Sequence, residues 1–561
     1  MGLTVTNVVG ALSAAWLIKS VLEKAMAVRA KRPMLGDCPG GSILWIHPFR
    51  TSAIAFGPIF PFVGQMGYYF AKFSLYAKYG STCLSSITFW NAIPIFWLSD
   101  GDAIKALSAD RKMFPKDVEA YETLNIYGPN IIGTEGADWK RHRSVANSAF
   151  NEANNALVWR ETIRLLDEWF AKLDLIQEKS HVPISVNLLK DLTQITLLVV
   201  SSAGFGRCAS LRDDSDTEPP PGHKLAFRPA VASTMSHLIP KVLTPDWIYD
   251  LSDKIYIPFL TPMLSDTREG FEALRLHMVE IVSQARAWIA GGKTAVMDAA
   301  LLRNLVEASM VEDGNRHLTD DELLSDTFSF LLAGHETSAH SLCFAVMILA
   351  AYPEIQQRVY EESVRLWPHG VPPPSATTSY KESMAKLEYT TAVFHETLRL
   401  YPAVARLAKV AAADKEIKAR QFSLTADGKP KDIKETIVPI KAGSVVIIDV
   451  FGLHANPIHW GEDNAEFKPE RFLDTEDYRW PREAFHGFSS GPRSCIGQRF
   501  ALTESVCILA HIVRRYRILT PGDVDPKIPA DQQPSLPQWT PGVTIIPKNA
   551  RIRLQLREKT G

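Results

Sequence analysis

Apolar residues recur every three to four positions over most of the chain, and this period is typical of amphipathic helices. The pattern predicts helices at 138–150, 153–176, 187–203, 270–291, 297–312, 319–351, 353–367, 383–400 and 497–514. β-Branched and aromatic runs at 82–89 and 93–98 are separated by Asn91-Ala92, which predicts a hairpin. Further short strands are expected at 445–449 and 543–546, and proline-rich loops at 213–222, 368–379 and 521–542. The predicted fold class is therefore predominantly α with small β-sheets (α+β).

The N-terminus carries the longest uncharged segment of this pattern. Sixteen consecutive residues, Leu3 to Ile18, lack charge, and the segment extends to about 20 residues, roughly the length that spans a bilayer. Four basic residues follow between Lys24 and Arg32, which places the remainder in the cytosol. A cleaved secretory signal or an interfacial helix are the alternatives. The predicted organisation is an anchor at 1–22, a basic and Pro/Gly-rich linker at 23–63, and one large domain at 64–561.

Charge and cysteine content exclude several classes of protein. The chain has 61 Lys+Arg and 62 Asp+Glu among 561 residues, so no net charge attracts nucleic acid. Six cysteines without a CxxC pair form neither a disulfide framework nor a zinc site of that type. We therefore expect a reducing compartment, and a cysteine that matters should act singly. No Gly-rich phosphate loop is present, so a nucleotide or flavin site of that kind is not expected.

The sharpest chemical motif is the segment 488–497, Phe-Ser-Ser-Gly-Pro-Arg-Ser-Cys-Ile-Gly. Its glycines and proline predict a tight loop that leads into the helix at 497–514. Cys495 then lies at a helix N-terminus, where the dipole and Arg493 favour a thiolate. Such a thiolate is either a nucleophile, with His486 as the nearest base, or an axial ligand to haem. A buried structural cysteine is the remaining interpretation.

The spacing Phe488-x-x-Gly491-x-Arg493-x-Cys495-x-Gly497 resembles the haem-binding signature of the cytochrome P-450 superfamily. The resemblance runs from about Trp139 to Arg515. It implies the cytochrome P-450 fold, with haem b between the long central helix and the cysteine loop. It also implies that Cys495 is the axial ligand of the haem iron, with Phe488 and Arg493 beside the cofactor.

The segment 319–352 carries a second signature of the family. Thr319-Asp320-Asp321-Glu322 is a capping box, which predicts the start of an unusually long helix. Within it, Ala333-Gly334-His335-Glu336-Thr337 resembles the oxygen-activation motif. The resemblance implies that Thr337 and Glu336 deliver protons and that Gly334 makes room for O2. The alternative is that Thr337 only bonds to a carbonyl one turn earlier.

Two further motifs match the family in the expected order. Trp139 and Arg143 fit its WxxxR helix, which implies hydrogen bonds to a haem propionate, and Lys409 in the strand at 406–410 aligns with another propionate partner. Glu396 and Arg399 form an ExxR pair, which the resemblance joins to Arg471 as a lock on the cysteine loop. Basic residues on the cysteine side are expected to dock an acidic electron donor, namely Lys140, Arg141, Arg499 and Arg514.

The resemblance implies a haem-dependent monooxygenase that inserts one oxygen atom of O2 into a lipophilic substrate. Its electrons would come from a separate NADPH-dependent diflavin reductase, and its location would be the endoplasmic reticulum membrane, as a single-pass protein with a cytosolic catalytic domain. The likeness to filamentous-fungal members suggests secondary-metabolite, terpenoid-like hydroxylation. The alternatives are a haem-thiolate isomerase or dehydratase acting on a peroxide, sterol or xenobiotic oxidation, and a non-catalytic haem carrier.

Overall fold

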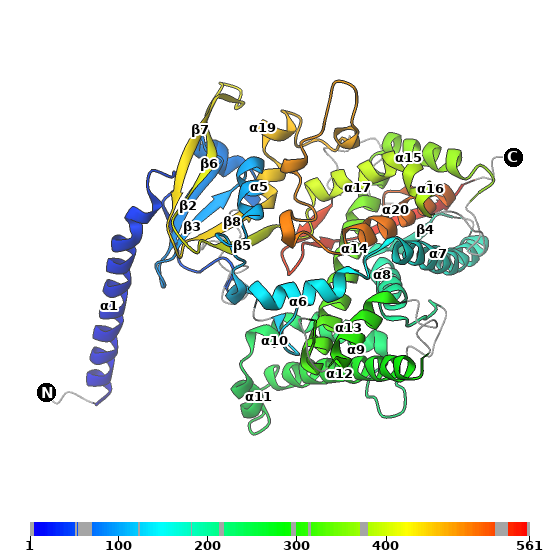
Figure 1. The fold of residues 1–561 in the computed structure, drawn as a ribbon, viewed down its shortest axis with the longest axis horizontal. Coiled ribbons are helices and arrows are strands. Elements are labelled where there is room, and N and C mark those ends of the chain that lie inside the picture. The colour runs from blue at the N-terminus through cyan, green and yellow to red at the C-terminus, as the bar shows by residue number, and fades with distance from the viewer. Residues whose placement is uncertain are drawn as a thin grey trace. The chain divides into compact units, whose positions relative to one another are not determined.

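The computed structural model describes residues 5–50, 53, 70–121, 124–180, 182–211, 218–292, 299–311, 316–370, 380–521 and 537–557. Within it the chain forms two compact units (Figure 1). The sheet unit comprises Met1–Ala120, Ala405–Glu466 and Pro481–Arg493, and the helical unit comprises Tyr121–Val404, Phe467–Trp480 and Ser494–Gly561. The chain passes repeatedly from one unit to the other, which explains why no single linker is visible in the sequence. The predicted boundary at 63/64 lies outside the described residues.

The sheet unit contains a five-stranded sheet of order β1-β2-β3-β8-β5. The predicted hairpin is confirmed: β2 and β3 pair antiparallel, with Ala92 of the turn at φ 48°. The strand predicted at 445–449 is β8, whereas the hairpin of β6 and β7 was not predicted. The strands are β1 (Ser42–Leu44), β2 (Cys83–Thr88), β3 (Pro94–Leu98), β5 (Arg406–Val410), β6 (Lys415–Leu424), β7 (Pro430–Ile440) and β8 (Val445–Asp449), and the helices of this unit are α1 (Val5–Lys31), α4 (Ser74–Tyr79), α5 (Gly101–Ala109), α18 (Val450–His454) and α19 (Pro457–Trp460).

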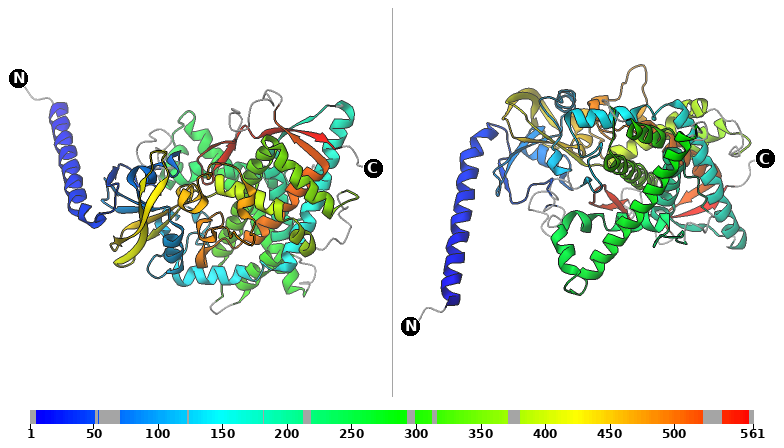
Figure 2. Two further views of the ribbon diagram at one scale, coloured as in Figure 1. Left: turned by 90° about the horizontal axis from the view of Figure 1, so that it is seen from above. Right: turned by 60° about the horizontal axis from the view of Figure 1, so that its bottom comes forward.

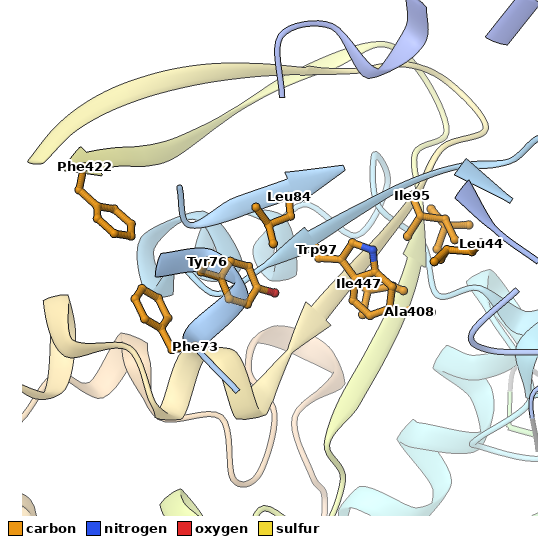
Figure 3. Close-up of a cluster of buried hydrophobic side chains, with 10 residues drawn as sticks. Leu44, Phe73, Tyr76, Leu84, Ile95, Trp97, Ala408, Phe422 and Ile447 are labelled. Carbon is orange, nitrogen blue, oxygen red and sulfur yellow. The ribbon is translucent and has the colours of Figure 1, made fainter. Parts of the chain in front are cut away.

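A compact apolar cluster forms the core of the sheet unit (Figure 3). Trp97 of β3 is fully buried there; its register partner is Ile447 of the neighbouring strand β8, and Ala408 of β5 lies one strand farther. The indole N–H of Trp97 donates to Ser86 Oγ at 2.9 Å. Tyr76 of α4 is equally buried and donates to Asp449 Oδ2 at 3.0 Å. These contacts join segments more than 300 residues apart in the sequence.

The helical unit contains most of the helices (Figure 2). The predicted helices are present within a few residues at most ends, with two differences: α12 begins ten residues earlier than predicted, and the helix predicted at 383–400 is divided into α16 and α17. The short helices α9, α10 and α11 were not predicted. The helices are α6 (Gly136–Asn147), α7 (Glu152–Ser180), α8 (Leu188–Phe205), α9 (Phe227–Ser236), α10 (Leu238–Leu243), α11 (Asp246–Ser252), α12 (Leu260–Ala290), α13 (Ala300–Met310), α14 (Asp320–Ala351), α15 (Pro353–Leu366), α16 (Tyr380–Lys386), α17 (Glu388–Leu400) and α20 (Gln498–Arg515).

Small sheets complete the helical unit. β4 (Ile184–Asn187), β12 (Arg551–Leu556) and β9 (Tyr516–Leu519) form one antiparallel sheet. β10 (Gln538–Thr540) pairs with β11 (Ile546–Lys548). The predicted strand at 543–546 is therefore wrong: that segment is mostly the turn between β10 and β11. The predicted loop at 521–542 contains β10, while 522–536 lie outside the described residues.

The segment predicted to be an anchor forms the first part of α1, which projects from the sheet unit (Figure 1). Residues 1–4 and the side chains of residues 5–11 lie outside the described part of the chain. Farther along, Leu12, Trp16 and Ile18 are each more than 60% exposed. Among the described residues, one helix is long and apolar enough to cross a membrane, Leu188–Phe205, and 72% of it is buried. It is α8, in the core of the helical unit.

Candidate active site

α14 is the long helix predicted from its capping box. Thr319 Oγ1 accepts from the Glu322 amide at 3.2 Å, and Glu322 Oε2 accepts from the Thr319 amide at 2.9 Å. Burial is nearly continuous along α14 but breaks at Ala333, which is exposed between buried Leu332 and His335. An exposed alanine in the middle of a buried helix indicates open space beside that turn, as the sequence motif predicts.

The polar residues of this turn have different surroundings. Thr337 Oγ1 donates to Ala333 O at 2.7 Å, which is the one-turn bond weighed above as the alternative. Glu336 is half-buried, and burial raises the pKa of its carboxyl. His335 is buried and its Nδ1 lies 2.7 Å from Leu331 O, so it is a structural residue.

Gly334 has a packing role that the sequence did not reveal. A Cβ at this position would lie 2.9 Å from Val200 Cγ2 of α8. The missing side chain therefore allows α8 and α14 to approach closely. The contact with residue 200 cannot be inferred from a local motif, and room for O2 at Gly334 stays a prediction.

Cys495 precedes α20, as predicted, and its side chain is exposed. The tight loop is also present, since Ser489 and Gly491 have φ of 59° and 70° and Gly491–Arg493 form a 3-10 turn. A Cβ on Gly497 would lie 3.8 Å from Phe150, an ordinary packing contact. The Phe150 ring lies 6.0 Å from that of Phe330 on α14. The cysteine loop and the apolar part of α14 thus pack against the same aromatic residue.

The surroundings of Cys495 affect the pKa of its thiol in both directions. Although the residue is exposed, desolvation by the protein around the sulfur raises this pKa, whereas the Gly497 N–H and Arg143 lower it. The sequence argument considered the helix terminus and the nearby cation but not the protein that surrounds the sulfur. A bound metal ion would further stabilise the thiolate.

α6 carries Trp139 and Arg143 toward the same loop. Arg143 Nη1 donates to Ser494 O at 2.9 Å, so this side chain holds the residue before Cys495. Trp139 is buried one turn earlier on the helix. Sequence reasoning missed the side chain between them: His142 is fully buried and its Nδ1 lies 2.6 Å from Asp326 Oδ2 of α14. Asp326, a charged residue among the apolar residues of the buried helix α14, was the sequence signal that could have indicated this contact.

The ExxR pair occupies the position expected of a structural lock. Arg399 Nε and Nη2 donate to the two Glu396 carboxylate oxygens at 2.6 and 2.7 Å, and both side chains are fully buried. Arg471 Nε lies 3.6 Å from the same carboxylate, and the Lys468 amide donates to it at 2.9 Å. The predicted association of Arg471 with the pair is confirmed.

Lys409, Phe488 and Arg493 belong to the sheet unit. Lys409 on β5 is buried, and its Nζ donates to Phe114 O at 3.2 Å. His486, the base considered for a nucleophilic cysteine, is buried in the same unit, and burial together with Lys409 lowers its pKa to about 4. Its backbone N–H donates to His454 Nε2 at 2.8 Å, which fixes it as part of the packing.

The residues present fit a haem group. One exposed cysteine without a second cysteine or histidine ligand beside it suits an axial position on haem iron. The segment before it contains buried polar atoms, His486 Nε2 and Ser490 Oγ, that have no hydrogen-bond partner among the described residues. Such atoms are rare in folded proteins and mark places where a polar group of a ligand is accommodated.

Another histidine cluster does not fit a metal. His223, His277 and Glu280 bring potential ligand atoms within 4.8 Å of one another. However, the two imidazole rings stack at 4.1 Å with an interplanar angle of 21°, so their in-plane lone pairs do not converge on one ion. His277 Nε2 lies 2.9 Å from Leu225 O and His223 Nε2 lies 2.7 Å from Glu280 Oε1, which explains the cluster as a polar link.

Comparison with known proteins identifies the class. The family model described as Cytochrome P450 matches residues 48–551. The chain is 34% identical over 505 residues, 90% of each chain, to "Cytochrome P450 monooxygenase 124" of Postia placenta. It is 25% identical over 504 residues, 83% of this chain and 81% of the other, to "Phomenoic acid biosynthesis cluster cytochrome P450 monooxygenase" of Leptosphaeria maculans. It is also 28% identical over 490 residues, 83% and 86% of the two chains, to "Cytochrome P450 3A16" of Mus musculus.

These matches define a haem-thiolate enzyme. The chain belongs to the cytochrome P450 family and is a monooxygenase that binds haem through a cysteine thiolate. Its reaction uses O2, a lipophilic substrate and a redox partner.

The basic cluster expected at the cysteine side is largely engaged. Arg141 donates to both Glu322 carboxylate oxygens at 2.7 Å and so secures the start of α14. Arg499 is paired with Glu152, and Arg514 Nε donates to Trp367 O at 3.1 Å. Sequence spacing does not reveal Glu322 as the partner of Arg141, and docking of an electron donor at this cluster stays a prediction.

Proposed function

We propose that this monooxygenase hydroxylates a neutral, lipophilic, terpenoid-like substrate in a fungal secondary-metabolite pathway. The observation that carries the proposal is the exposed turn at Ala333 on the buried helix α14, next to Glu336 and Thr337. Apolar walls with few polar groups are typical of sites for lipophilic ligands. Phe330 and Leu331, one turn earlier, are buried and apolar.

Cys495 holds the haem iron in this proposal, and haem supplies the chemistry by which O2 is reduced and cleaved. Arg143 fixes the cysteine loop through the Ser494 carbonyl. Trp139 and Arg143 of the helical unit, with Lys409 and Arg493 of the sheet unit, would supply hydrogen bonds and positive charge to the propionates, and Phe488 would contribute an apolar contact.

Glu336 and Thr337 have the proton-transfer role. Burial raises the pKa of Glu336, so its carboxyl holds a proton closer to neutral pH than an exposed glutamate does. The Thr337 hydroxyl donates to Ala333 O, which leaves its oxygen lone pairs free to accept a hydrogen bond from water. Together they can pass a proton from the carboxyl to the exposed turn.

The electron donor in this proposal is an NADPH-dependent diflavin reductase at the endoplasmic reticulum membrane. Lys140 is exposed on α6, the helix that carries Arg143, and offers positive charge to an acidic donor. The exposed apolar residues of α1 support a membrane anchor with the catalytic domain in the cytosol. Exposed Trp247, Tyr256 and Phe259 between α10 and α12 supply further apolar surface for lipid.

The name of the Leptosphaeria relative supports a biosynthetic role, since it places that protein in a biosynthesis cluster. Terpenoids suit the apolar residues beside this turn, Phe330 and Leu331, because they present C–H bonds and few charges. This assignment of substrate class is tested by incubating the reconstituted enzyme with neutral sesquiterpenes and with aromatic polyketides. Oxidation of polyketides alone would contradict it.

The ligand assignment is tested by the spectrum of the reduced enzyme with carbon monoxide. We expect the strongly red-shifted Soret band of a thiolate-ligated haem, and Cys495→Ala should lose it. Cys208→Ala is the matched control, because Cys208 is also an exposed cysteine of the helical unit. A thiolate spectrum in Cys495→Ala would refute the assignment.

The proton-transfer role is tested with two threonines of the same helix. Thr327 Oγ1 donates to Leu323 O at 2.8 Å, as Thr337 does to Ala333 O at 2.7 Å. Thr337→Ala should increase the share of NADPH electrons released as hydrogen peroxide, whereas Thr327→Ala should leave that share unchanged. Equal coupling in both variants would mean that Thr337 has only the structural bond.

A further inference from the structure

Two cysteines of the sheet unit lie in contact although they are 45 residues apart. Cys38 Sγ is 3.6 Å from Cys83 Sγ and 3.5 Å from the Cys83 carbonyl oxygen. A disulfide requires about 2.05 Å between sulfurs, so an approach of about 1.5 Å joins them. Cys83 is fully buried at the start of β2, whereas Cys38 is only partly buried.

The linker that carries Cys38 is held on β2 by hydrogen bonds to one residue. The Ser85 amide donates to Pro39 O at 2.7 Å, and Ser85 Oγ donates to Cys38 O at 2.8 Å. The Gly41 amide donates to Ser85 Oγ at 3.1 Å. The approach of the two thiols is therefore built into the packing of the linker.

Gly40 allows this close approach. Its φ is +112°, a conformation that other residues rarely adopt, and an added Cβ would lie 2.6 Å from Ser85 O. Any side chain at this position must push the linker away from β2. Gly40 thus determines the distance between Cys38 and Cys83.

We propose that Cys38 and Cys83 are a peroxide-sensitive thiol pair whose disulfide ties the segment behind α1 to β2. Hydrogen peroxide reaches the partly exposed Cys38 and oxidises it to a sulfenic acid, with release of one water. The Cys83 sulfur then attacks the Cys38 sulfur. The S–S bond forms, the S–O bond breaks, and the departing hydroxide takes the Cys83 proton and leaves as a second water.

The two thiols together lose two electrons and two protons, and one peroxide is reduced. The contact with Cys38 and burial raise the pKa of Cys83 and protect it from direct oxidation, so peroxide reacts first at Cys38. The sequence does not mark this pair, because 44 residues separate the two thiols and no CxxC motif includes them.

The disulfide would act close to the end of α1. Cys38 follows the last helical residue, Lys31, by one 3-10 turn, Arg32–Leu35. A covalent bond at this point limits how far α1 can pivot on the sheet unit. The pair thus offers a redox-dependent constraint between the N-terminal helix and the sheet, and it does not depend on the substrate proposed above.

The test uses the full-length haem-loaded enzyme in detergent. The enzyme is treated with hydrogen peroxide, denatured, alkylated with N-ethylmaleimide and mapped by mass spectrometry. We expect Cys38 and Cys83 to lose alkylation together and to appear in one cross-linked peptide pair that lacks two hydrogens. Dithiothreitol should restore both. Exposed Cys208 is the internal control, which should oxidise without joining another cysteine of the chain.

Two variants separate proximity from general reactivity. Cys38→Ser should leave Cys83 fully alkylated after peroxide treatment. Gly40→Ala retains both thiols but displaces the linker, so cross-linking should be much slower. If Gly40→Ala does not accumulate, Ser85→Ala also loosens the linker and should slow cross-linking in the same way. Over-oxidation of Cys38 with Cys83 still alkylated would overturn the proposal, as would unchanged cross-linking in both linker variants.

Discussion

The buried ion pair between Glu396 and Arg399 gives the sharpest energetic test of this structure. Both side chains are 0% exposed, and two hydrogen bonds of 2.6 and 2.7 Å join them. Arg399→Leu leaves the carboxylate buried without its main partner. Breaking one side of a buried pair costs about 3–5 kcal/mol. Arg471, at 3.6 Å, and the Lys468 amide still compensate part of the charge, so we expect about 3 kcal/mol.

The chain provides a matched control with the same spacing. Glu272 and Arg275 also form an ExxR pair within a helix, α12, with hydrogen bonds of 3.0 and 3.1 Å. Their side chains are 53% and 42% exposed, so water screens the interaction. Arg275→Leu should therefore cost about 0–1 kcal/mol. The comparison isolates the effect of burial on the ion pair, because the two pairs share their residue types, their spacing and their location within a helix.

The assay is urea unfolding of the haem-loaded enzyme, followed by far-ultraviolet circular dichroism and by haem absorbance. Burial raises the pKa of Glu396 and Arg399 is the main influence that lowers it, so removing Arg399 raises this pKa further. A carboxyl whose pKa is higher in the folded state favours folding when protonated and loses that contribution as pH rises. The destabilisation of Arg399→Leu should thus shrink as pH falls toward about 5. Equal losses in Arg399→Leu and Arg275→Leu would refute the reasoning.

Three further outcomes are expected. Burial raises the pKa of Glu504 to about 8. Its stabilising contribution is therefore complete below the unfolded pKa of about 4.3 and is lost as pH rises through 8. Glu504→Gln should flatten the fall in the free energy of unfolding over this range. The pKa of Glu322 is lowered to about 2, because hydrogen bonds and charge from Arg141 outweigh burial. The contribution of this carboxylate to stability is present above about 4.3 and is lost as pH falls toward 2. Arg141→Met should make acid unfolding, followed by circular dichroism, begin at higher pH. Gly491 has φ +70°, and an added Cβ would lie 2.6 Å from a carbonyl oxygen of α5, whereas Gly443 has φ +78° and open space around it. Gly491→Ala should reduce haem incorporation, measured as haem absorbance per protein. Gly443→Ala should cost only about 1 kcal/mol of stability.

Local patterns in the sequence determined a large part of this protein. The period of apolar residues located the helices, since each helix buries one face whatever its partner is. Thr319 and Glu322 marked the start of α14, because a capping box uses atoms only three residues apart. The cysteine loop and the ExxR pair were equally readable, since spacing alone brings their residues together.

The tertiary structure decided what lies opposite those local features. Val200 fills the space at Gly334, Glu322 engages Arg141, and Cys83 meets Cys38. Each contact joins segments far apart in the sequence, and no periodicity encodes which faces meet. The pKa of Cys495 depends on the same information, because desolvation by the surrounding protein raises it while the local Gly497 N–H lowers it. Sequence thus supplied the reactive groups, and packing determined their partners and their charge.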